Sequence, residues 1–409
     1  MRREQSLTRH LDHARHEPDA MRWQTLAAAP FDLTMVRRVL VVRLRSIGDT
    51  VLATPTLAAL RHFLPEARIE ILLEEWVAPL LTAHPDVDEV VTIKRGDTMN
   101  RIRAVRGLRA RKYDVVFNLH GGTTATLLTR TTGAPHRVGF ADYQYGFLHN
   151  HAAPPAASLW GRSPLHSVEQ QLAIVAAVGV PVSSHIPTRL AVTEQATAHI
   201  ASKLSAHGIT HDESVALLHP AAAFATKQWT TEGFARIAEH LSARGFKVVA
   251  LAAAHERTTL EALRTLIRAP LVTFDDLTLP EVTALAERAS LFVGNDSGVA
   301  HIAAAVRTPS VIIFGSSNVA HWRPWIPKDA VPFEVVREEM PCQPCAGYKC
   351  YEFDDPECIK NVTVERVTRA IERVLTQASG ILPHKHLQAS DAVVPLLRDN
   401  PSSYEAKAN

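Results

Sequence analysis

The stretch Leu291-Phe-Val-Gly-Asn-Asp-Ser-Gly-Val-Ala-His-Ile-Ala-Ala-Ala305 indicates a strand, a tight loop and the start of a helix. Gly294 permits a sharp turn, and Asn295 to Ser297 are residue types favoured at helix N-termini. Such a terminus carries free N–H groups and about half a positive charge, so it suits a phosphate group. Ser297 and His301 lie four residues apart and can face the same ligand. The alternative is a capped helix of an α/β domain without a ligand.

The composition describes an ordinary globular protein. The chain has 409 residues, 46% hydrophobic and 21% charged, which predicts about two domains. A net charge of +2 gives no indication of a nucleic-acid partner. The sequence contains no apolar run long enough for a bilayer, and its start lacks the apolar core of a signal peptide. We therefore expect a cytoplasmic protein.

The pattern of strands and helices occurs twice along the chain. Apolar strands at 38–44, 68–73, 89–93, 114–119 and 137–140 alternate with helices at 51–63, 76–83, 99–112, after 122 and at 166–178. After a linker near 181–193, strands at 214–219, 246–251, 290–293 and 309–314 alternate with helices at 231–243, 256–268 and 280–288, and a last helix covers 363–375. This alternation predicts an α/β fold with two Rossmann-like parallel sheets facing a cleft.

We divide the chain into an N-terminal extension at 1–35, a first Rossmann-like domain at 36–185, a second at 186–375 and a tail at 376–409. The extension is expected to contain at most one loose helix. Ligands bind at the carboxyl ends of the strands in such sheets. Neither half contains a G-x-G-x-x-G fingerprint, which disfavours a dinucleotide-dependent dehydrogenase.

Several motifs resemble glycosyltransferase family 9, the lipopolysaccharide heptosyltransferases. They are Val39-Leu-Val-Val-Arg-Leu-Arg-Ser-Ile-Gly-Asp-Thr-Val-Leu-Ala-Thr-Pro-Thr-Leu57, His84-Pro-Asp-Val-Asp-Glu-Val-Val91, His166-Ser-Val-Glu169, His219-Pro220 with Lys227-Gln-Trp229, and Gly294-Asn-Asp-Ser-Gly-Val-Ala-His301. The resemblance covers about residues 36–375. It implies a GT-B fold whose last helix crosses back to the first domain. It also implies inverting, metal-independent transfer of heptose from ADP-heptose to a lipopolysaccharide core acceptor, with no cofactor required for transfer.

The resemblance implies that Asp49 is the catalytic base. Inverting transfer needs a base that takes the proton of the acceptor hydroxyl as its oxygen attacks the anomeric carbon. Asp49 follows a strand on a glycine-containing loop, where such a base would face the cleft. The alternative is that Asp49 only caps the next helix.

The resemblance likewise implies that Lys227 binds the donor phosphates. A metal-free enzyme must neutralise the departing diphosphate with protein groups, and a lysine is a suitable point charge. The helix start at Asp296, Ser297, Gly298 and His301 supplies the rest of this site. Asp296 is acidic, so we expect it to orient loop amides or a sugar hydroxyl.

Glu256 is a candidate for binding the ribose hydroxyls of the donor. The chain reads Ala252-Ala-Ala-His-Glu256 where many relatives carry a glycine-rich turn, which weakens the correspondence. A glutamate stabilising the N-terminus of the following helix explains the residue equally well.

Basic residues suggest contacts with an anionic acceptor. Arg43 and Arg45 lie near the proposed base, and Arg103 and Arg106 belong to a run of cations on one predicted helix. A charge run is usually a solvated helix face. Because the implied acceptor is an anionic lipid-linked saccharide, we instead hypothesise that this helix makes peripheral contact with the inner membrane.

Cys342, Cys345, Cys350 and Cys358 are the four cysteines of the chain. Clustered thiols in a cytosolic protein suggest a structural zinc or an iron–sulfur site. Reduced free thiols are the alternative.

Three other functions remain open. The chain could be a family member that uses another nucleotide sugar or acceptor, a nucleotide-sugar epimerase with a similar pair of domains, or a nucleotide-binding protein without activity. The presence of both Asp49 and Lys227 argues against an inactive protein.

Overall fold

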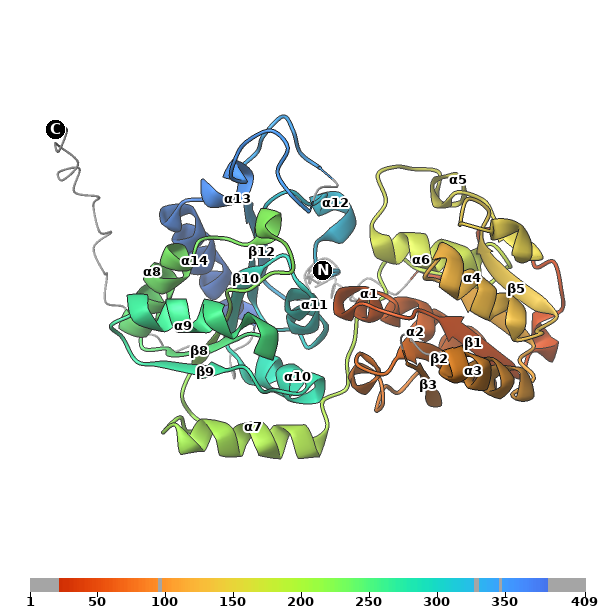
Figure 1. Cartoon of the computed structure of the whole chain (residues 1–409), viewed down its shortest axis with the longest axis horizontal. Helices are drawn as coiled ribbons and strands as arrows, with labels where there is room; N and C mark the ends of the chain where they lie inside the picture. The colour runs from red at the N-terminus through yellow and green to blue at the C-terminus, as the bar shows by residue number, and fades with distance from the viewer. Residues whose placement is uncertain (1–21, 95–97, 327–330, 346–347, 382–409) are drawn as a thin grey trace, which may run out of the picture.

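Two parallel six-stranded sheets form the framework of the chain (Figure 1). The computed structural model describes residues 22–94, 98–326, 331–345 and 348–381. The strand orders are β3-β2-β1-β4-β5-β6 and β12-β11-β10-β7-β8-β9. Numbered within each half, both orders are that of a Rossmann-type sheet, in which the chain reverses its direction of winding beside the first strand. The predicted α/β class with two such sheets is confirmed.

The first half alternates strands and helices from residue 38 onward. Its strands are β1 Arg38–Val42, β2 Arg68–Glu74, β3 Glu89–Ile93, β4 Val115–Asn118, β5 His136–Phe140 and β6 His151–Ala153. Its α-helices are α1 Ile47–Leu52, α2 Thr54–Phe63, α3 Thr98–Ala110, α4 Gly122–Thr131, α5 Ala156–Trp160 and α6 Ser167–Ala176. Short 3₁₀ turns occur at Leu33–Met35, Ala78–Leu80 and Gly146–Leu148.

The second half repeats the arrangement. Its strands are β7 Val215–His219, β8 Lys247–Leu251, β9 Leu271–Phe274, β10 Leu291–Asn295, β11 Ser310–Phe314 and β12 Phe333–Arg337. Its α-helices are α7 Glu194–Ala206, α8 Thr231–Ala243, α9 Arg257–Leu266, α10 Leu279–Arg288, α11 Gly298–Ala305, α12 Val319–Trp322, α13 Glu357–Lys360 and α14 Val364–Ile381. The 3₁₀ turns are Ala225–Lys227 and Ala254–Glu256.

Successive side chains along each strand point to opposite faces of the sheet. On β1, Leu40 and Val42 pack with α3 and α4, whereas Val39 and Val41 pack with α2 and α6. The apolar cluster that contains Val39 and Val41 continues through α10 and α11 into the second half, where it covers one face of β7. One apolar core therefore joins the two halves, and the burial of this surface stabilises their contact.

Several elements differ from the expectations. The helix predicted at 76–83 is only a short 3₁₀ turn, because the Pro79 ring cannot continue a helix from the preceding turn. The strands β6, β9 and β12 were not predicted; β6 has three residues, and all three lie at sheet edges. Residues 22–35 contain no α-helix, and Gln24 forms an isolated bridge with Val182. Residues 1–21 and 382–409, most of the predicted extension and tail, lie outside the described part.

The last helix stays in its own half. The resemblance implied that it crosses back to the first domain, but α14 packs on β11, β12 and α8 (Figure 1). Its buried residues Val367, Ile371 and Val374 recur at helical spacing and belong to the core of the second half. Because these buried residues pack in the core beside β11 and β12, the helix remains on the second half and does not cross to the first.

Within the part of the chain that the structure describes, no helix has both the length and the apolar content needed to cross a membrane.

Candidate active site

Four loops converge at the points where the two sheets reverse their winding. In the first sheet these loops follow β1 and β4, which are neighbours. In the second sheet they follow β7 and β10. Asp49 lies after β1 and His120 after β4, while Lys227 lies after β7 and Ser297 after β10. Ligands bind at such reversal points in α/β sheets, so the sequence-predicted base and donor residues occupy the expected positions.

Helices α1 and α11 bring the two halves into direct contact (Figure 1). A Cβ atom on Gly298 would lie 2.7 Å from Cβ of Ile47, and a Cβ on Gly48 would lie 2.7 Å from Cδ2 of His301. Only residues without a side chain allow this approach. The loops of Asp49 and Ser297 therefore face each other across one interface, as we expected from the sequence.

Asp49 is held by side chains of its own half. Arg43 forms an ion pair with the Asp49 carboxylate, and Ser46 Oγ donates a hydrogen bond to Asp49 Oδ2 at 3.0 Å. Arg43 is buried and its Nη1 also donates to the carbonyl of Leu119 at 2.8 Å. Arg43 thus fixes the orientation of Asp49, a contact that the prediction of an acceptor-binding arginine did not include.

A cavity of about 500 Å³ opens beside Asp49. His120 and Tyr143 line it from the first half, and His321 and Trp322 of α12 line it from the second. Burial is the main reason that the pKa of His120 is lowered to about 4, with a further contribution from Arg43. Its imidazole is therefore neutral near pH 7, and the buried Nδ1 atom has no hydrogen-bond partner among the described residues.

On the other side of the interface, Lys227 is paired with Asp296. Lys227 Nζ lies 2.8 Å from Asp296 Oδ2, and Ser317 Oγ donates to the same oxygen at 2.5 Å. Asp296 is buried, whereas Lys227 remains about one quarter exposed. The acidic residue therefore orients the lysine, which refines the expectation that it orients loop amides or a sugar hydroxyl.

The N-terminus of α11 is Ser297, but its side chain does not cap the helix. Ser297 Oγ instead contacts His219 Nδ1 at 3.1 Å. Burial lowers the pKa of His219 to about 4 and also lowers the pKa of His301, so both imidazoles are neutral. His301 Nδ1 is buried without a hydrogen-bond partner among the described residues. The first backbone N–H groups of α11 are free of a side-chain cap, as an anion site requires.

Glu256 stabilises the start of a helix. Its carboxylate accepts a hydrogen bond from the N–H of Ala253 at 3.0 Å, directly before α9. This is the alternative to ribose binding that the sequence left open. The residue still lies after the carboxyl end of β8, which neighbours β7.

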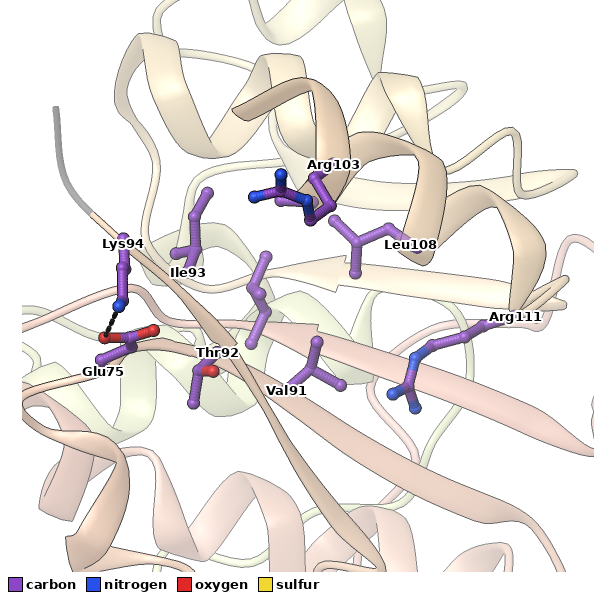
Figure 2. Close-up of a pocket in the computed structure, with 11 residues that line it drawn as sticks. Glu75, Val91, Thr92, Ile93, Lys94, Arg103, Leu108 and Arg111 are labelled. Carbon is purple, nitrogen blue, oxygen red and sulfur yellow. Dashed lines mark ion pairs between the residues drawn. The ribbon is translucent and has the colours of Figure 1, made fainter. Parts of the chain in front are cut away.

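The predicted acceptor arginines separate into two groups. Arg45 is exposed and close enough to His120 to lower its pKa. Arg103 and Arg106 are exposed on α3, beside another cavity of about 360 Å³, and neither lines the cavity that contains Asp49. Figure 2 shows Arg103 and Leu108 of α3 above Val91 and Ile93 of β3.

One arginine of the same basic run has a structural partner. Arg111 pairs with Glu70 and Glu89, and the Glu70 side chain is fully buried. Figure 2 places Arg111 at the far end of the cavity from Lys94, which pairs with Glu75 at 3.6 Å. The side chain of Arg101 lies outside the described part. The run is therefore only partly a solvated face.

The four cysteines lie between β12 and the end of α13. They line one small cavity together. Burial raises the pKa of Cys358, and the neighbouring thiols of Cys345, Cys342 and Cys350 raise it further. Among the described residues, no three His, Cys, Asp or Glu side chains are arranged as a ready metal-binding group.

Two Rossmann-like halves whose strand-end loops meet at one interface define the GT-B class of glycosyltransferase. A family model described as glycosyltransferase family 9 (heptosyltransferase) matches residues 101–353, more than half of the chain. The chain therefore belongs to glycosyltransferase family 9.

Individual relatives agree with this assignment. Lipopolysaccharide heptosyltransferase 3 of Escherichia coli K12 is 29% identical over 298 residues, which cover 69% of this chain and 83% of that protein. A solved glycosyltransferase of family 9 from Veillonella parvula has a TM-score of 0.71 at 20% identity, covering 83% of this chain and 97% of that one. The structure of E. coli ADP-heptose lps heptosyltransferase II has a TM-score of 0.67 at 21% identity, covering 84% and 99%. The predicted GT-B fold is confirmed.

Sequence reasoning gave no role to His120, His219 or Ser317. His120 and His219 directly follow or end the strands β4 and β7, so their positions at carboxyl strand ends were a usable signal. Ser317 lies in the loop after β11, and only the folded chain brings it to Asp296.

Proposed function

We propose that this glycosyltransferase transfers a heptose from ADP-heptose to a saccharide acceptor of the lipopolysaccharide core. The observation that carries the proposal is the packing of α1, which bears Asp49, against α11, whose N-terminus adjoins Lys227 and Asp296. This arrangement suits a reaction in which one group removes a proton while others stabilise a departing diphosphate. The names of the relatives supply the sugar and the nucleotide.

The proposed reaction inverts the configuration of the anomeric carbon. An acceptor hydroxyl in the cavity beside Asp49 attacks that carbon from the face opposite the diphosphate. Asp49 takes the hydroxyl proton as the new C–O bond forms, and the bond to the diphosphate oxygen breaks with its electron pair leaving on ADP. Arg43 and Ser46 hold the carboxylate in place for this step.

The transfer requires no metal ion in this proposal. Lys227 and the N-terminal amides of α11 face the position where charge develops on the leaving diphosphate. Because Asp296 and Ser317 already position Lys227, little reorganisation is needed when the donor binds. Ser297, Gly298 and His301 form the adjoining wall, and Glu256 is the proposed contact for the ribose.

Turnover measurements with and without acceptor test the function. We expect ADP release from ADP-heptose only when a core acceptor is present, and no release from other nucleotide sugars. Preference for a different nucleotide sugar would indicate a family member with another donor specificity. Conversion of the nucleotide sugar without acceptor would indicate an epimerase. Binding of ADP-heptose without any turnover would indicate an inactive protein.

The variant Asp49→Asn tests the base. We expect transfer to fall by about 10²- to 10⁴-fold, because the amide cannot accept the proton, while calorimetry shows unchanged ADP binding. The comparison variant is Asp142→Asn, which removes a second carboxylate of the same cavity. Near-normal turnover by Asp49→Asn, or an equal loss in Asp142→Asn, would contradict the assignment of Asp49.

Helix α3 is the proposed contact with an anionic lipid at the cytoplasmic face of the inner membrane. Arg103 and Arg106 are exposed there, and Arg45 is the proposed contact with acidic groups of the acceptor near Asp49. We expect Arg103→Glu/Arg106→Glu to weaken sedimentation with anionic liposomes and to raise the KM for a lipid-linked acceptor. The control is Arg369→Glu on α14, an exposed charge reversal in the other half. Equal liposome binding by both variants would exclude α3 as the membrane contact.

A further inference from the structure

The cysteine segment forms a further cavity of about 100 Å³, separate from the cavity that contains Asp49. All four cysteines of the chain line it. Cys358 is buried at the start of α13, and the other three thiols are partly buried in the preceding loop. The rest of the lining combines apolar residues such as Met340 and Phe353 with polar ones, among them Glu352 and Glu357. Nothing in the proposed transfer reaction uses these thiols.

We propose that Cys342, Cys345, Cys350 and Cys358 bind a single divalent metal ion as thiolates, and that this site holds the loops of the donor site in place. Four thiolates suit a tetrahedral zinc or ferrous ion. A cavity of this size suits one ion with its four sulfur ligands. The metal part of the proposal is independent of the proposed function, whereas the effect on the donor site depends on it.

The thiols surround the cavity without forming a finished coordination shell. Rotation about the bond between Cα and Cβ moves a cysteine sulfur by about 3 Å, so rotamer changes can bring the sulfurs that line this cavity closer together. Zinc–sulfur bonds are about 2.3 Å long, so four sulfurs around one ion lie close together. Four neutral thiols around one cavity make only weak interactions with each other. A bound cation would stabilise all four as thiolates.

Backbone contacts attach the cysteine segment to the loop after β11. The N–H of Cys345 donates to the carbonyl of Ser316 at 3.1 Å, and Gln343 Nε2 donates to the carbonyl of Gly315 at 2.7 Å. One donor is Cys345 itself, and the other, Gln343, lies between Cys342 and Cys345. A metal ion that fixes this turn therefore also fixes residues 315–316.

The same loop holds the donor site. The N–H of Ser316 donates to the carbonyl of Thr226, the residue before Lys227, at 3.2 Å. The next residue, Ser317, donates to Asp296, which pairs with Lys227. Thr226 itself lines the cysteine cavity. Two short routes thus lead from the cavity to the lysine, one along the chain and one through Asp296.

An aromatic contact reinforces this attachment. Phe224 and Tyr348, which lies between Cys345 and Cys350, have ring centroids 4.5 Å apart. Phe224 directly precedes the 3₁₀ turn that ends at Lys227. Loss of the metal would release Tyr348 and with it the aromatic contact that supports one side of the Lys227 turn.

Metal analysis of the full chain, purified without chelator, tests the site directly. We expect about one zinc or iron ion per chain by mass spectrometry; in the case of iron, thiolate-to-iron absorption should lie in the near ultraviolet and move into the visible when the ion is oxidised to the ferric state. Because all four cysteines of the chain belong to this site, the reaction rate with a thiol reagent reports on this site and on no other thiol. Thiols should react slowly until a chelator removes the metal. A metal-free protein with four rapidly reacting thiols, or with disulfides, would overturn the proposal.

Cysteine variants test which residues bind the ion. Cys350→Ser and Cys345→Ser should each lower the metal content to less than half, because serine does not replace a thiolate for these ions. Tyr351→Ser is the matched control, since this exposed residue lines the same cavity without supplying a thiol. It should keep the metal. Retention of metal in both cysteine variants would exclude a site made of four thiolates.

The effect on the donor site has its own measurement. After removal of the metal, we expect the Kd for ADP to rise about tenfold and to recover when the same ion is returned. Circular dichroism and the melting temperature of Tyr351→Ser and Cys350→Ser separate this effect from unfolding. If the protein contains the metal but its ADP affinity does not change when the metal is removed, the metal site stands and its role in positioning Lys227 is wrong. Absence of ADP binding in the metal-loaded wild type would instead contradict the proposed function.

Discussion

Asp296 determines where the positive charge of Lys227 lies. Among the described residues, the buried Asp296 carboxylate pairs with the hydroxyl of Ser317 and the ammonium of Lys227, and loss of either partner would leave its charge less compensated. This pairing means that Lys227 is already oriented before a diphosphate arrives. The donor gains a positioned cation, at the cost of competing with Asp296 for it.

Two variants separate these contributions. We expect Lys227→Met to raise the Kd for ADP by about 10- to 100-fold, because the diphosphate loses its cation and Asp296 becomes an unpaired buried charge. Ser317→Ala removes only the hydroxyl that holds Asp296, so we expect a rise of about tenfold or less. Calorimetric titration with ADP measures both. A larger effect for Ser317→Ala than for Lys227→Met would show that the lysine does not contact the phosphates.

The sequence located these residues without revealing their partners. The motif positions of Asp49, Lys227 and Ser297 correspond to loops that the fold brings to one interface. The pairing of Arg43 with Asp49 and of Lys227 with Asp296 could not be predicted, since the latter pair is 69 residues apart and depends on side-chain packing. Spacing along a chain gives information about contacts only within one helix or strand.

At the level of secondary structure, the central strands were predictable, whereas three of the four edge strands were not; the edge strand β3 was predicted. The strands β1, β4, β7 and β10 are almost entirely buried, and each contains an unbroken apolar run of at least three residues, which is a strong signal. In contrast, β9 and β12 are only partly buried, and β6 has three residues. Their formation depends on pairing with a neighbouring strand that is already in place.

Helix α6 connects the first half to the second through its N-terminal residue. His166 Nδ1 accepts a hydrogen bond from the N–H of Val168, which caps the helix. The other ring nitrogen, Nε2, lies 2.7 Å from the carbonyl of Arg323 in the second half. These contacts require a neutral ring that donates from Nε2. Burial lowers the pKa of His166 to about 3, in agreement with that state.

The acid sensitivity of the fold should depend on this histidine. The unfolded chain binds a proton at His166 below about pH 6.5, but the folded chain does so only near pH 3. Stability therefore falls as the pH is lowered through this window, by about 2 kcal/mol between pH 7 and pH 5. We expect His166→Asn to be less stable at pH 7 by about 1 kcal/mol, since it loses the bond to Arg323, but to show a shallower loss on acidification.

Urea titrations at pH 7 and pH 5 measure this difference. His166→Ala is the companion variant, because it loses the helix cap as well and should be less stable than His166→Asn by about 1 kcal/mol at pH 7. Equal pH dependence in wild type and His166→Asn would show that other buried groups, such as His219 and His120, account for the acid sensitivity.

On the scale of the whole molecule, the two halves repeat one strand order and use equivalent positions for the site. The strands β4 and β10 are equivalent, and both end in a fully buried asparagine. Asn118 Oδ1 accepts from the N–H of Gly121, and Asn295 Oδ1 accepts from the N–H of Trp229. Each asparagine thus orders a loop that faces the other half, which explains how two similar sheets build the two sides of one site.

The contact between the halves can be tested at Gly298. We expect Gly298→Ala to lower kcat/KM by tenfold or more, because the new methyl group would lie 2.7 Å from Ile47 Cβ and force α1 away from α11. Gly107→Ala on α3, where nothing lies within 4 Å, is the control and should keep full activity. Kinetics and melting temperatures of both variants provide the measurement. Full activity of Gly298→Ala would mean that α1 and α11 are further apart in the working enzyme.

The position of this glycine contact also determines what a rotation between the halves can change. Because α1 and α11 touch beside the reacting groups, they would act as a fulcrum. Displacement during a rotation increases with distance from the fulcrum, so the outer walls of the 500 Å³ cavity would move most and the separation of Asp49 and Ser297 least. The opening through which substrates enter could then widen and narrow while the spacing of the reacting groups is preserved.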